Sequence, residues 1–307
     1  MPSLLRTLVL VNPTSGGGAA LRAQPVIESF LRGQNFPADF RHTSSAADMR
    51  QRAANAAAEG YACVAALGGD GAFHYVMSGA FGTDITIACI PAGSGNDIAM
   101  GLGIPLDPID AAHLLVRGTP RPVDLLRLRF LGNVTQLMIG AGGMGLDAEA
   151  NQLATGRFRR VPGLLKYVTA ALAALTSSRP LHITAEIDEA HWKGHLLLAA
   201  VANSPTYGAG FKIAPAAHMN DGWMDLTFVE DLPWQRIFEA LLILLRSGDL
   251  RWPQIHRFRA RRVCLSANRR SPFHGDGEIL GEAPLEIEIL PAAIHVIAPP
   301  FRTEAAG

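Results

Sequence analysis

Gly68-Gly69-Asp70-Gly71 carries the strongest signal in this chain. An apolar run of strand length, residues 61–67, comes before it, and residues 72–80 after it can form a helix. Glycines let backbone N–H groups approach an anion closely, and a helix N-terminus adds the positive end of its dipole. Because the carboxylate of Asp70 repels phosphate, we expect it to handle magnesium or to activate a hydroxyl group. The segment predicts a phosphate-handling turn, with an ordinary tight turn as the alternative.

Strands and helices alternate through the first 125 residues. The predicted strands are 7–11, 38–42, 61–67 and 85–90, and the predicted helices are 19–34, 46–60, 72–80, 97–102 and 110–118. This order predicts a parallel sheet with both faces covered. Ligands on such sheets gather at the carboxyl ends of the strands. Three glycine-rich loops fall at that edge, at residues 12–18, 68–71 and 93–96.

The pattern changes near residue 125. Strand-like runs then follow one another with few helices: 125–130, 135–140, 183–187, 196–202, 224–229, 261–266, 285–290 and 295–298. Helices are expected at 164–177 and 234–247. The pattern predicts an antiparallel β-sandwich. We therefore expect an α/β domain over residues 1–124 and a sandwich domain over 125–295.

Length and composition exclude several classes of protein. At 307 residues the chain is long enough for two domains, because single cores rarely exceed about 250–300 residues. The formal net charge of zero argues against a nucleic-acid partner. No apolar stretch is long enough to span a membrane, and the three cysteines lie far apart. We expect a protein of the reducing cytoplasm without a transmembrane segment.

Arginines are concentrated near the end of the chain. Eight of them lie between Arg246 and Arg270 with a single acid, Asp249. We interpret this cluster as the solvated face of a strand. The alternative is a patch that meets an anionic membrane, which would place the protein peripherally on the inner face of the membrane. The aliphatic run at 240–245 has two interpretations as well, a core helix or a lipid-facing groove.

Two further loops could hold phosphate. Residues 12–18 (NPTSGGG) combine hydroxyls with successive glycine N–H groups, which make a nest for an anion, although the lysine of a P-loop is missing. In the loop 91–97, Ser94 can donate to a phosphate oxygen, while Asn96 or Asp97 can cap the next helix. An ordinary turn and an ordinary capped loop are the alternatives.

Acidic residues mark two places in the second half. Asp276 and Glu278 are two residues apart, so in extended chain both carboxylates point the same way, as a base-bearing or metal-bearing pair requires. The alternative is a hairpin turn, since Asp-Gly is a strong turn signal. Asp221 with neighbouring carbonyls could hold a hard cation. The G-x-G-x-x-G match at 140–145 is a weak dinucleotide signal, because it lies where the pattern turns antiparallel.

Four segments in one order resemble the diacylglycerol kinase catalytic superfamily, which includes soluble bacterial lipid kinases and sphingosine kinases. They are N-P-T-S-G, G-G-D-G, G-S-G-N-D and G-D-G-E, and the resemblance spans residues 5 to about 300. It implies a phosphofructokinase-like nucleotide domain and a sandwich that bears the lipid site, with residues from about 296 to 307 packed back on the first domain. It also implies transfer of the γ-phosphate of ATP to a diacylglycerol-like or sphingoid-like hydroxyl in a cleft between the domains.

The resemblance implies roles for individual residues. Asp70 acts near the phosphates with Mg²⁺, Asp124 joins it through metal and water, and Glu278 accepts the proton of the lipid hydroxyl with Asp276 beside it. Asp221, with the carbonyls of His218 and Trp223, matches a structural magnesium site. The residues expected to bind ATP are Asn12, Pro13, Thr14, Ser15, Gly16, Thr43, Gly68, Gly69, Asp70, Gly71, Ala72, Phe73, His74, Gly93, Ser94, Gly95 and Asn96.

Two residues depart from the family pattern. Ala72 stands where threonine is usual and removes a hydroxyl, whereas Ser94 replaces the commoner threonine and keeps it. Two other functions stay open: an NAD-kinase-like enzyme, and a catalytically weak lipid-binding or regulatory protein. The expected partner is a lipid substrate at a membrane surface. The identity of the lipid and the oligomeric state stay open, with a homodimer as one option.

Overall fold

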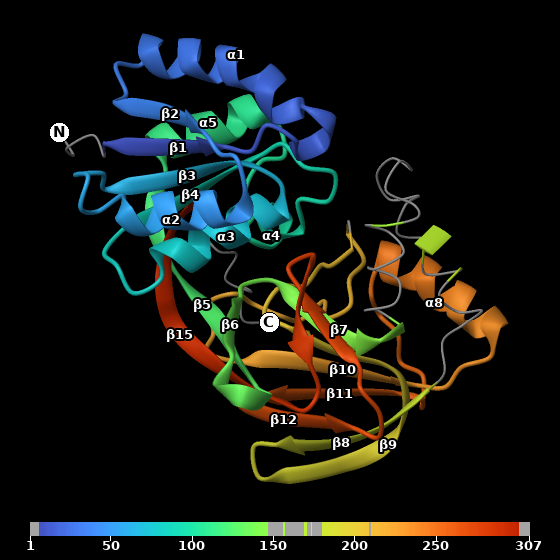
Figure 1. Ribbon diagram of the computed structural model, residues 1–307. Coiled ribbons are helices and arrows are strands. Elements are labelled where there is room, and N and C mark those ends of the chain that lie inside the picture. Colours follow the sequence, from blue (N-terminus) through green and yellow to red (C-terminus); the bar gives the residue numbers. More distant parts are fainter. Residues whose placement is uncertain are drawn as a thin grey trace. The chain divides into compact units, whose positions relative to one another are not determined.

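The computed structural model describes residues 6–146, 180–208 and 210–300, together with the single positions 156, 169, 170 and 173. The chain divides into two compact units (Figure 1). Unit 1 comprises Met1–Val123 and Ala292–Gly307, and unit 2 comprises Asp124–Pro291. Strand β15 (Leu285–Ala298) contributes residues to both units.

Unit 1 is built on a parallel sheet. Its strands β1 (Thr7–Val11), β2 (Ala38–His42), β3 (Cys63–Gly68) and β4 (Thr86–Pro91) follow the order β4-β3-β1-β2, and β15 pairs in parallel with β4 through His295 and Val296. The helices are α1 (Ala19–Gly33), α2 (Ala46–Asn55), α3 (Asp70–Ala80), α4 (Asp97–Gly101) and α5 (Pro108–Arg117). In Figure 1, α1 and α5 cover one face of the sheet, and α2 and α3 cover the other. This arrangement confirms the predicted α/β fold.

The strands of unit 1 form where the apolar runs are continuous. Every residue of β1, β3 and β4 is buried, as expected for strands covered on both faces. Helix α2 ends at Asn55, five residues earlier than expected. The reason is local: Gly60 adopts a left-handed φ of 79°, and the backbone N–H of Tyr61 donates to the carbonyl of Ala56 at 3.0 Å, which closes the helix end.

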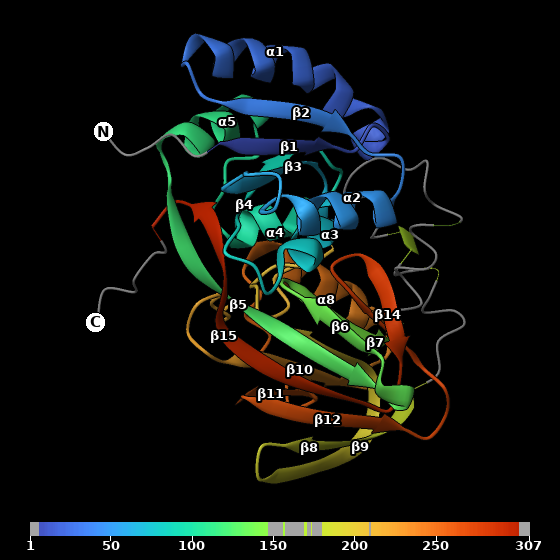
Figure 2. The ribbon, with the colours of Figure 1, turned by 60° about the vertical axis from the view of Figure 1, so that its left-hand side comes forward.

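Unit 2 is an antiparallel β-sandwich with one described long helix, α8 (Trp234–Arg246). Its strands, seen in Figure 2, are β5 (Thr119–Phe130, shared with unit 1), β6 (Thr135–Met138), β7 (Ala141–Gly145), β8 (Leu181–Ile187), β9 (Ala190–Ala202), β10 (Met224–Glu230), β11 (Ile255–Ala260), β12 (Arg262–Ala267), β13 (Pro272–Gly275), β14 (Glu278–Glu282) and β15. The long strand β9 pairs with β8 through its first half and lies between β7 and β10 through its second. Alternate side chains from these strands, among them Leu126, Ile183 and Phe228, fill one apolar core. The predicted sandwich is confirmed.

The structure changes some expected elements. The runs at 285–290 and 295–298 belong to the single strand β15, and strands β7, β11, β13 and β14 were not anticipated from the pattern. β7 occupies the G-x-G-x-x-G segment, where a methyl group on Gly142 would lie 2.7 Å from the Cα of Gly275. The glycines there serve close strand packing rather than a dinucleotide turn. The helix expected at 164–177 lies largely outside the described residues, as does the chain after residue 300.

Helix α8 contains the aliphatic run at 240–245. Ile237 packs against Leu146, Leu197 and Val229 in a small apolar cluster, so one face of the helix is core. On the other face Phe238 is 49% exposed and Leu242 is 45% exposed. The core-helix interpretation therefore holds for one face of α8 only. In the described part of the chain, no helix has the length and apolar character needed to cross a membrane.

Candidate functional site

Three glycine-rich loops of unit 1 touch one another at the carboxyl ends of β1, β3 and β4. A methyl group added to Gly93 would lie 2.5 Å from the Cα of Gly69, and one added to Gly68 would lie 3.1 Å from Oγ of Ser15. On Gly16, a methyl group would collide with the carbonyl oxygen of Ala92. Any side chain at these positions would push the loops apart. The structure thus brings together the three loops that the sequence placed at one sheet edge.

Hydrogen bonds hold the loops in this arrangement. The backbone N–H of Gly69 donates to Oγ of Ser15 at 3.3 Å, and that of Ala92 donates to the carbonyl of Gly68 at 2.7 Å. Asn96 closes its own loop, because its Oδ1 accepts from Gly93 N–H at 3.0 Å and its Nδ2 donates to the Gly93 carbonyl at 3.1 Å. A cradle fixed in this way needs little reorganisation to receive a ligand.

The first loop has a backbone that only glycines adopt easily. Gly16, Gly17 and Gly18 have φ of 56°, 60° and 85°, and they lead directly into α1. Gly16 and Gly17 are both exposed. Asn12 fixes the start of the loop, since its Oδ1 accepts from the N–H and the hydroxyl of Thr14 at 3.1 and 2.9 Å. Successive N–H groups in such turns form anion-binding nests.

Asp70 is the first residue of α3 and is half-buried. Its Oδ1 accepts a hydrogen bond from the backbone N–H of Ile98 at 2.9 Å. That bond ties the G-G-D-G turn to the start of α4, the helix that follows the Ser94 loop. Ser94 itself is exposed. Asp70 therefore has a structural contact in addition to any role at the phosphates.

Several residues expected to contact ATP have buried side chains. Phe73 and His74 face the interior of unit 1, and Ala72 is buried beside Gly68. Thr43 is also buried, and its hydroxyl donates to the carbonyl of Val11 at 3.0 Å. In the native chain these side chains shape the loops, and most contacts to a ligand fall to the exposed and half-exposed loop residues. Pro13, Gly71 and Gly95 are among the half-exposed ones.

The acidic motif of unit 2 forms a hairpin turn between β13 and β14. Asp276 and Gly277 have φ of 52° and 88°, the pattern of a two-residue type I′ turn, for which Asp-Gly is a preferred sequence. Of the two interpretations of this motif, the hairpin turn is therefore confirmed, and the extended pair with parallel carboxylates is not formed. Asp276 is buried, and its two carboxylate oxygens accept from the N–H groups of Ile139 and Gly140 at 2.9 and 2.8 Å. Glu278, at the start of β14, is half-buried.

A buried pair supports the same hairpin. Nε2 of His274 and the hydroxyl of Tyr207 share a hydrogen bond at 2.9 Å. Burial lowers the pKa of His274 from 6.5 to about 4. No motif marks Tyr207 in the sequence, because this residue lies in an irregular stretch after β9. This contact joins that stretch to the strand that leads to Glu278.

The shifted pKa of His274 predicts how stability depends on pH. The imidazole stays neutral in the folded chain, whereas the unfolded chain takes up a proton near pH 6.5, so acid favours unfolding. The contribution of His274 is intact above pH 6.5 and is lost as the pH falls toward about 4, by at most roughly 3 kcal/mol. We expect His274→Gln to flatten this part of the profile, measured as urea unfolding free energy at intervals from pH 7 to pH 4. Equal slopes for both proteins would contradict the assignment.

The residues expected to bind metal gather around one loop of unit 2. The carboxylate of buried Asp124 accepts from Gly222 N–H at 2.7 Å, and its backbone N–H donates to the carbonyl of Met219 at 2.8 Å. Asp221 accepts from Trp223 N–H at 3.0 Å and forms an ion pair with Arg259. Carboxylates and the carbonyls of this loop are the oxygen donors that magnesium prefers. The donor types fit, although Arg259 already neutralises Asp221.

No cluster of three His, Cys, Asp or Glu side chains suited to a metal occurs within the described residues. Any cation here would depend on backbone carbonyls, such as those of His218 and Trp223. Asn203 is a further residue of this region that the sequence did not single out. It is fully buried, and its Nδ2 donates to the carbonyls of Asp124 and Ile139, both at 2.9 Å. The sequence marks Asn203 only as a single asparagine directly after the apolar run of β9.

Several arginines of the 246–270 cluster form ion pairs, hydrogen bonds or ring contacts with other residues of the chain. Arg251 pairs with Asp249, Arg259 with Asp221, and Arg262 with Glu286. Arg257 donates to the carbonyl of Gly248 at 2.8 Å, and the guanidinium of Arg261 lies 4.6 Å from the ring centre of Trp223. These contacts support the interpretation of the arginine cluster as the solvated face of a strand.

The chain thus combines a glycine-lined cradle on a parallel sheet with an antiparallel sandwich that carries an acidic hairpin, which is the combination expected of a two-domain phosphotransferase. Two family models match the chain. One, described as the diacylglycerol kinase catalytic domain, matches residues 6–128. The other, described as the YegS C-terminal NAD kinase beta sandwich-like domain, matches residues 140–298.

Individual relatives agree with the family models. The diacylglycerol kinase of Mycobacterium tuberculosis is 30% identical over 96% of this chain and 95% of its own. The "Probable lipid kinase YegS-like" protein of Pseudomonas putida is 31% identical over 88% of both chains. The crystal structure of a diacylglycerol kinase from Bacillus anthracis shares the fold, with a TM-score of 0.75 over 98% of this chain and 99% of that chain at 19% identity.

The chain therefore belongs to the diacylglycerol kinase family. It is a kinase of the lipid-kinase type, and kinase chemistry implies ATP as the phosphoryl donor.

Proposed function

We propose that this protein transfers the γ-phosphate of ATP to a hydroxyl group of a diacylglycerol-like or sphingoid-like lipid, presented at a membrane surface on the cytoplasmic side. The observation that carries the proposal is the contact of three glycine-rich loops at one edge of the sheet in unit 1. Phosphoryl transfer depends mainly on positioning and on neutralising charge, and a fixed cradle of backbone donors supplies both.

In unit 1, the phosphates of ATP would lie against the N–H groups of two exposed residues, Gly16 and Gly17, and the hydroxyl of exposed Ser94. The N-terminus of α1 adds the positive end of its dipole there. Magnesium held near Asp70 would supply charge neutralisation of the phosphate oxygens. Asp70 keeps the G-G-D-G turn in place through its bond to Ile98.

In unit 2, Glu278 would accept the proton of the lipid hydroxyl. The lipid oxygen then forms the new bond to phosphorus as the bond to the β-phosphate oxygen breaks, and ADP leaves. Asp276 is not free to share this role, because both of its oxygens accept from backbone N–H groups. We assign it to positioning: it fixes the turn from which Glu278 starts.

Ala72 offers a test of the cradle. We expect Ala72→Thr to bind ATP about tenfold more tightly than Ala72→Val, because a hydrogen bond to a charged group contributes about 1.5–3 kcal/mol. Valine has the shape of threonine without its hydroxyl, so the pair cancels the packing cost at this buried position. Calorimetric titration with a non-hydrolysable ATP analogue and magnesium measures the difference. Equal affinities would show that position 72 does not reach the phosphates.

The function itself is tested with radiolabelled ATP and candidate acceptors in mixed micelles. The panel contains diacylglycerol, a sphingoid base, ceramide, phosphatidylglycerol and free NAD. Label in one of the lipids supports the proposal and identifies the substrate class. Label in NAD alone would favour the NAD-kinase-like alternative. Lipid binding without any ATP turnover would favour a regulatory lipid-binding protein instead.

A further inference from the structure

We propose that Asn203 is a positioning residue for the reaction, because it holds the loop around Asp124 and the hairpin that carries Glu278 in one fixed arrangement. The inference rests on the proposed function, which gives Glu278 its role. Asn203 directly follows β9 and is fully buried. The residues whose contacts support the proposal all belong to unit 2.

The side-chain amide of Asn203 joins two segments of the backbone. Its Nδ2 donates to the carbonyl of Asp124, in β5, and to the carbonyl of Ile139, the residue after β6, both at 2.9 Å. A carbonyl oxygen only accepts hydrogen bonds, so the nitrogen of the amide, and not its oxygen, must face these two groups. The two partners therefore fix the orientation of the side chain.

Asn203 and Asp276 together bind the backbone of the buried dipeptide Ile139-Gly140. Asn203 serves the two carbonyls: Nδ2 donates to that of Ile139, and the backbone N–H donates to that of Gly140 at 2.8 Å. Asp276 serves the two N–H groups, which lie 2.9 and 2.8 Å from its carboxylate oxygens. An unpaired buried backbone group is costly, so a shift of either residue strains its bonds to the dipeptide. The end of β9 is thereby linked to the turn of the acidic hairpin.

Asp124 links Asn203 to a loop on the other side. The backbone N–H of Asp124 donates to the Met219 carbonyl at 2.8 Å, and its carboxylate accepts from Gly222 N–H at 2.7 Å. The carbonyl of the same residue accepts from Asn203. A continuous set of hydrogen bonds thus runs from this loop through Asn203 to the acidic hairpin.

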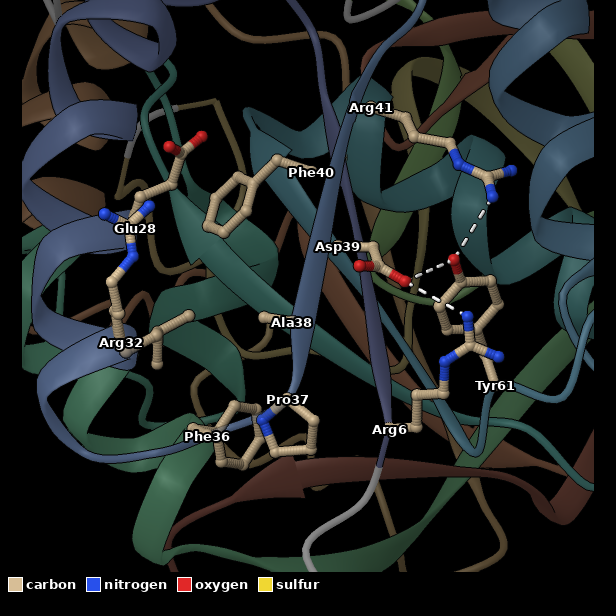
Figure 3. A pocket seen from close by; sticks show the side chains of 11 residues that line it. Arg6, Glu28, Arg32, Phe36, Pro37, Ala38, Asp39, Phe40, Arg41 and Tyr61 are labelled. Carbon is tan, nitrogen blue, oxygen red and sulfur yellow. Dashed lines mark hydrogen bonds and ion pairs between the residues drawn. The ribbon is translucent and has the colours of Figure 1, made fainter.

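These bonds differ from the polar contacts at the surface of unit 1. Beside the open pocket at β2, Asp39 accepts from the hydroxyl of Tyr61 at 2.7 Å and pairs with Arg6 at 3.2 Å (Figure 3). The side chains of Arg6 and Asp39 are 52% and 53% exposed, so water can replace their contacts at little cost. Asn203 has no exposed surface, and a bond lost there leaves a buried group unpaired.

Glu278 takes its position from this set of bonds. It begins β14, directly after the turn that contains Asp276. A reacting group that is displaced by about 1 Å can lose about 100-fold in rate. Without the amide of Asn203, the dipeptide is held by Asp276 alone, so the turn and Glu278 can move. The residues proposed to bind ATP lie in unit 1, and we expect their affinity for ATP to stay the same.

Two substitutions remove the side-chain donors of Asn203. Asn203→Asp keeps the shape but places carboxylate oxygens opposite the two carbonyls, and Asn203→Ala removes the amide altogether. Each should lower kcat for lipid phosphorylation by about 10–100-fold and leave KM for ATP within about twofold of the wild type. Both are measured so that one folded variant is sufficient, and urea unfolding verifies the folded state.

Thr227→Val is the matched control. Thr227 is buried in unit 2, and its hydroxyl donates to the Ile213 carbonyl at 3.0 Å, so valine also leaves a buried carbonyl without this donor. The contact is not part of the set of bonds around Asn203, and kcat should stay within about twofold of the wild type. Asp39→Asn, at the exposed pair in Figure 3, should leave kcat unchanged as well.

Hydrogen exchange measured by mass spectrometry tests the coupling without any assay of activity. In the Asn203 variants, amide protons of both the loop 218–223 and the hairpin 272–282 should exchange at least about tenfold faster than in the wild type. Residues 183–187 of β8 are the internal reference and should exchange at an unchanged rate. Thr227→Val should accelerate neither the loop nor the hairpin.

Three results would overturn the proposal. They are faster exchange in only one of the two segments, an unchanged kcat in a variant whose loop and hairpin both exchange faster, and an equal fall in kcat for Thr227→Val and Asn203→Ala. The exchange measurement needs no substrate, whereas lipid phosphorylation by the wild-type chain tests the proposed function alone. The two proposals can therefore fail separately.

Discussion

Glu278→Gln should lower kcat for lipid phosphorylation by about 10²–10³-fold while the protein stays folded and continues to bind ATP. Glutamine has nearly the same shape as glutamate but cannot accept the proton of an attacking hydroxyl. The residues proposed to hold ATP lie in unit 1, so the affinity for the nucleotide should not change. Initial rates at saturating ATP and lipid measure kcat, and calorimetry measures nucleotide binding.

The same strand provides a matched control for this substitution. Glu282 is the last residue of β14 and is exposed. Glu282→Gln makes the same chemical change four residues away and should leave kcat within about twofold of the wild type. If Glu278→Gln behaved like Glu282→Gln, Glu278 would not be the base. A loss of nucleotide affinity in Glu278→Gln would also count against the assignment, because it would indicate a wider disturbance.

Local sequence patterns were sufficient for the fold of unit 1. The buried strands β1, β3 and β4 are continuous apolar runs, and each is followed by glycines or a capping residue, so both the parallel sheet and the convergence of its loops could be predicted. In unit 2 the hydrophobic pattern does not predict the short strands β13 and β14. Glycine and proline occupy positions in them that alone favour turns. These segments are extended because β13 pairs with β7 and β14 pairs with β13.

The convergence of the loops at the candidate site could be predicted from the sequence, but the directions of the side chains could not. Motifs identify Asp70, Asp276 and Glu278, yet they cannot show that Asp70 bonds to Ile98 or that Asp276 is buried against Ile139 and Gly140. Those contacts join residues far apart in the sequence. The strong Asp-Gly turn signal was the local clue that Asp276 and Glu278 do not form an extended pair.

Asp276→Ala should destabilise the protein by about 2–5 kcal/mol. The substitution leaves the N–H groups of Ile139 and Gly140 without their carboxylate acceptors at a buried position, and it places alanine at a left-handed φ of 52°. Urea unfolding of the whole chain measures the loss. Asp276→Asn keeps one acceptor oxygen and tolerates the same backbone, so its loss should be smaller.

Asp276→Gly separates the two causes of this destabilisation. Glycine adopts the left-handed turn without strain but supplies no acceptor, so its stability should lie between those of the asparagine and alanine variants. In each of the three variants, kcat should fall only as far as the hairpin that carries Glu278 is disturbed, and Asp276→Asn should retain most of the activity.

If Asp276→Asn were as stable as the wild type and yet lost activity as completely as Glu278→Gln, Asp276 would act in catalysis and not in positioning. The backbone bonds at 2.9 and 2.8 Å favour positioning, because they hold the carboxylate of Asp276 against the N–H groups of Ile139 and Gly140 at a buried position.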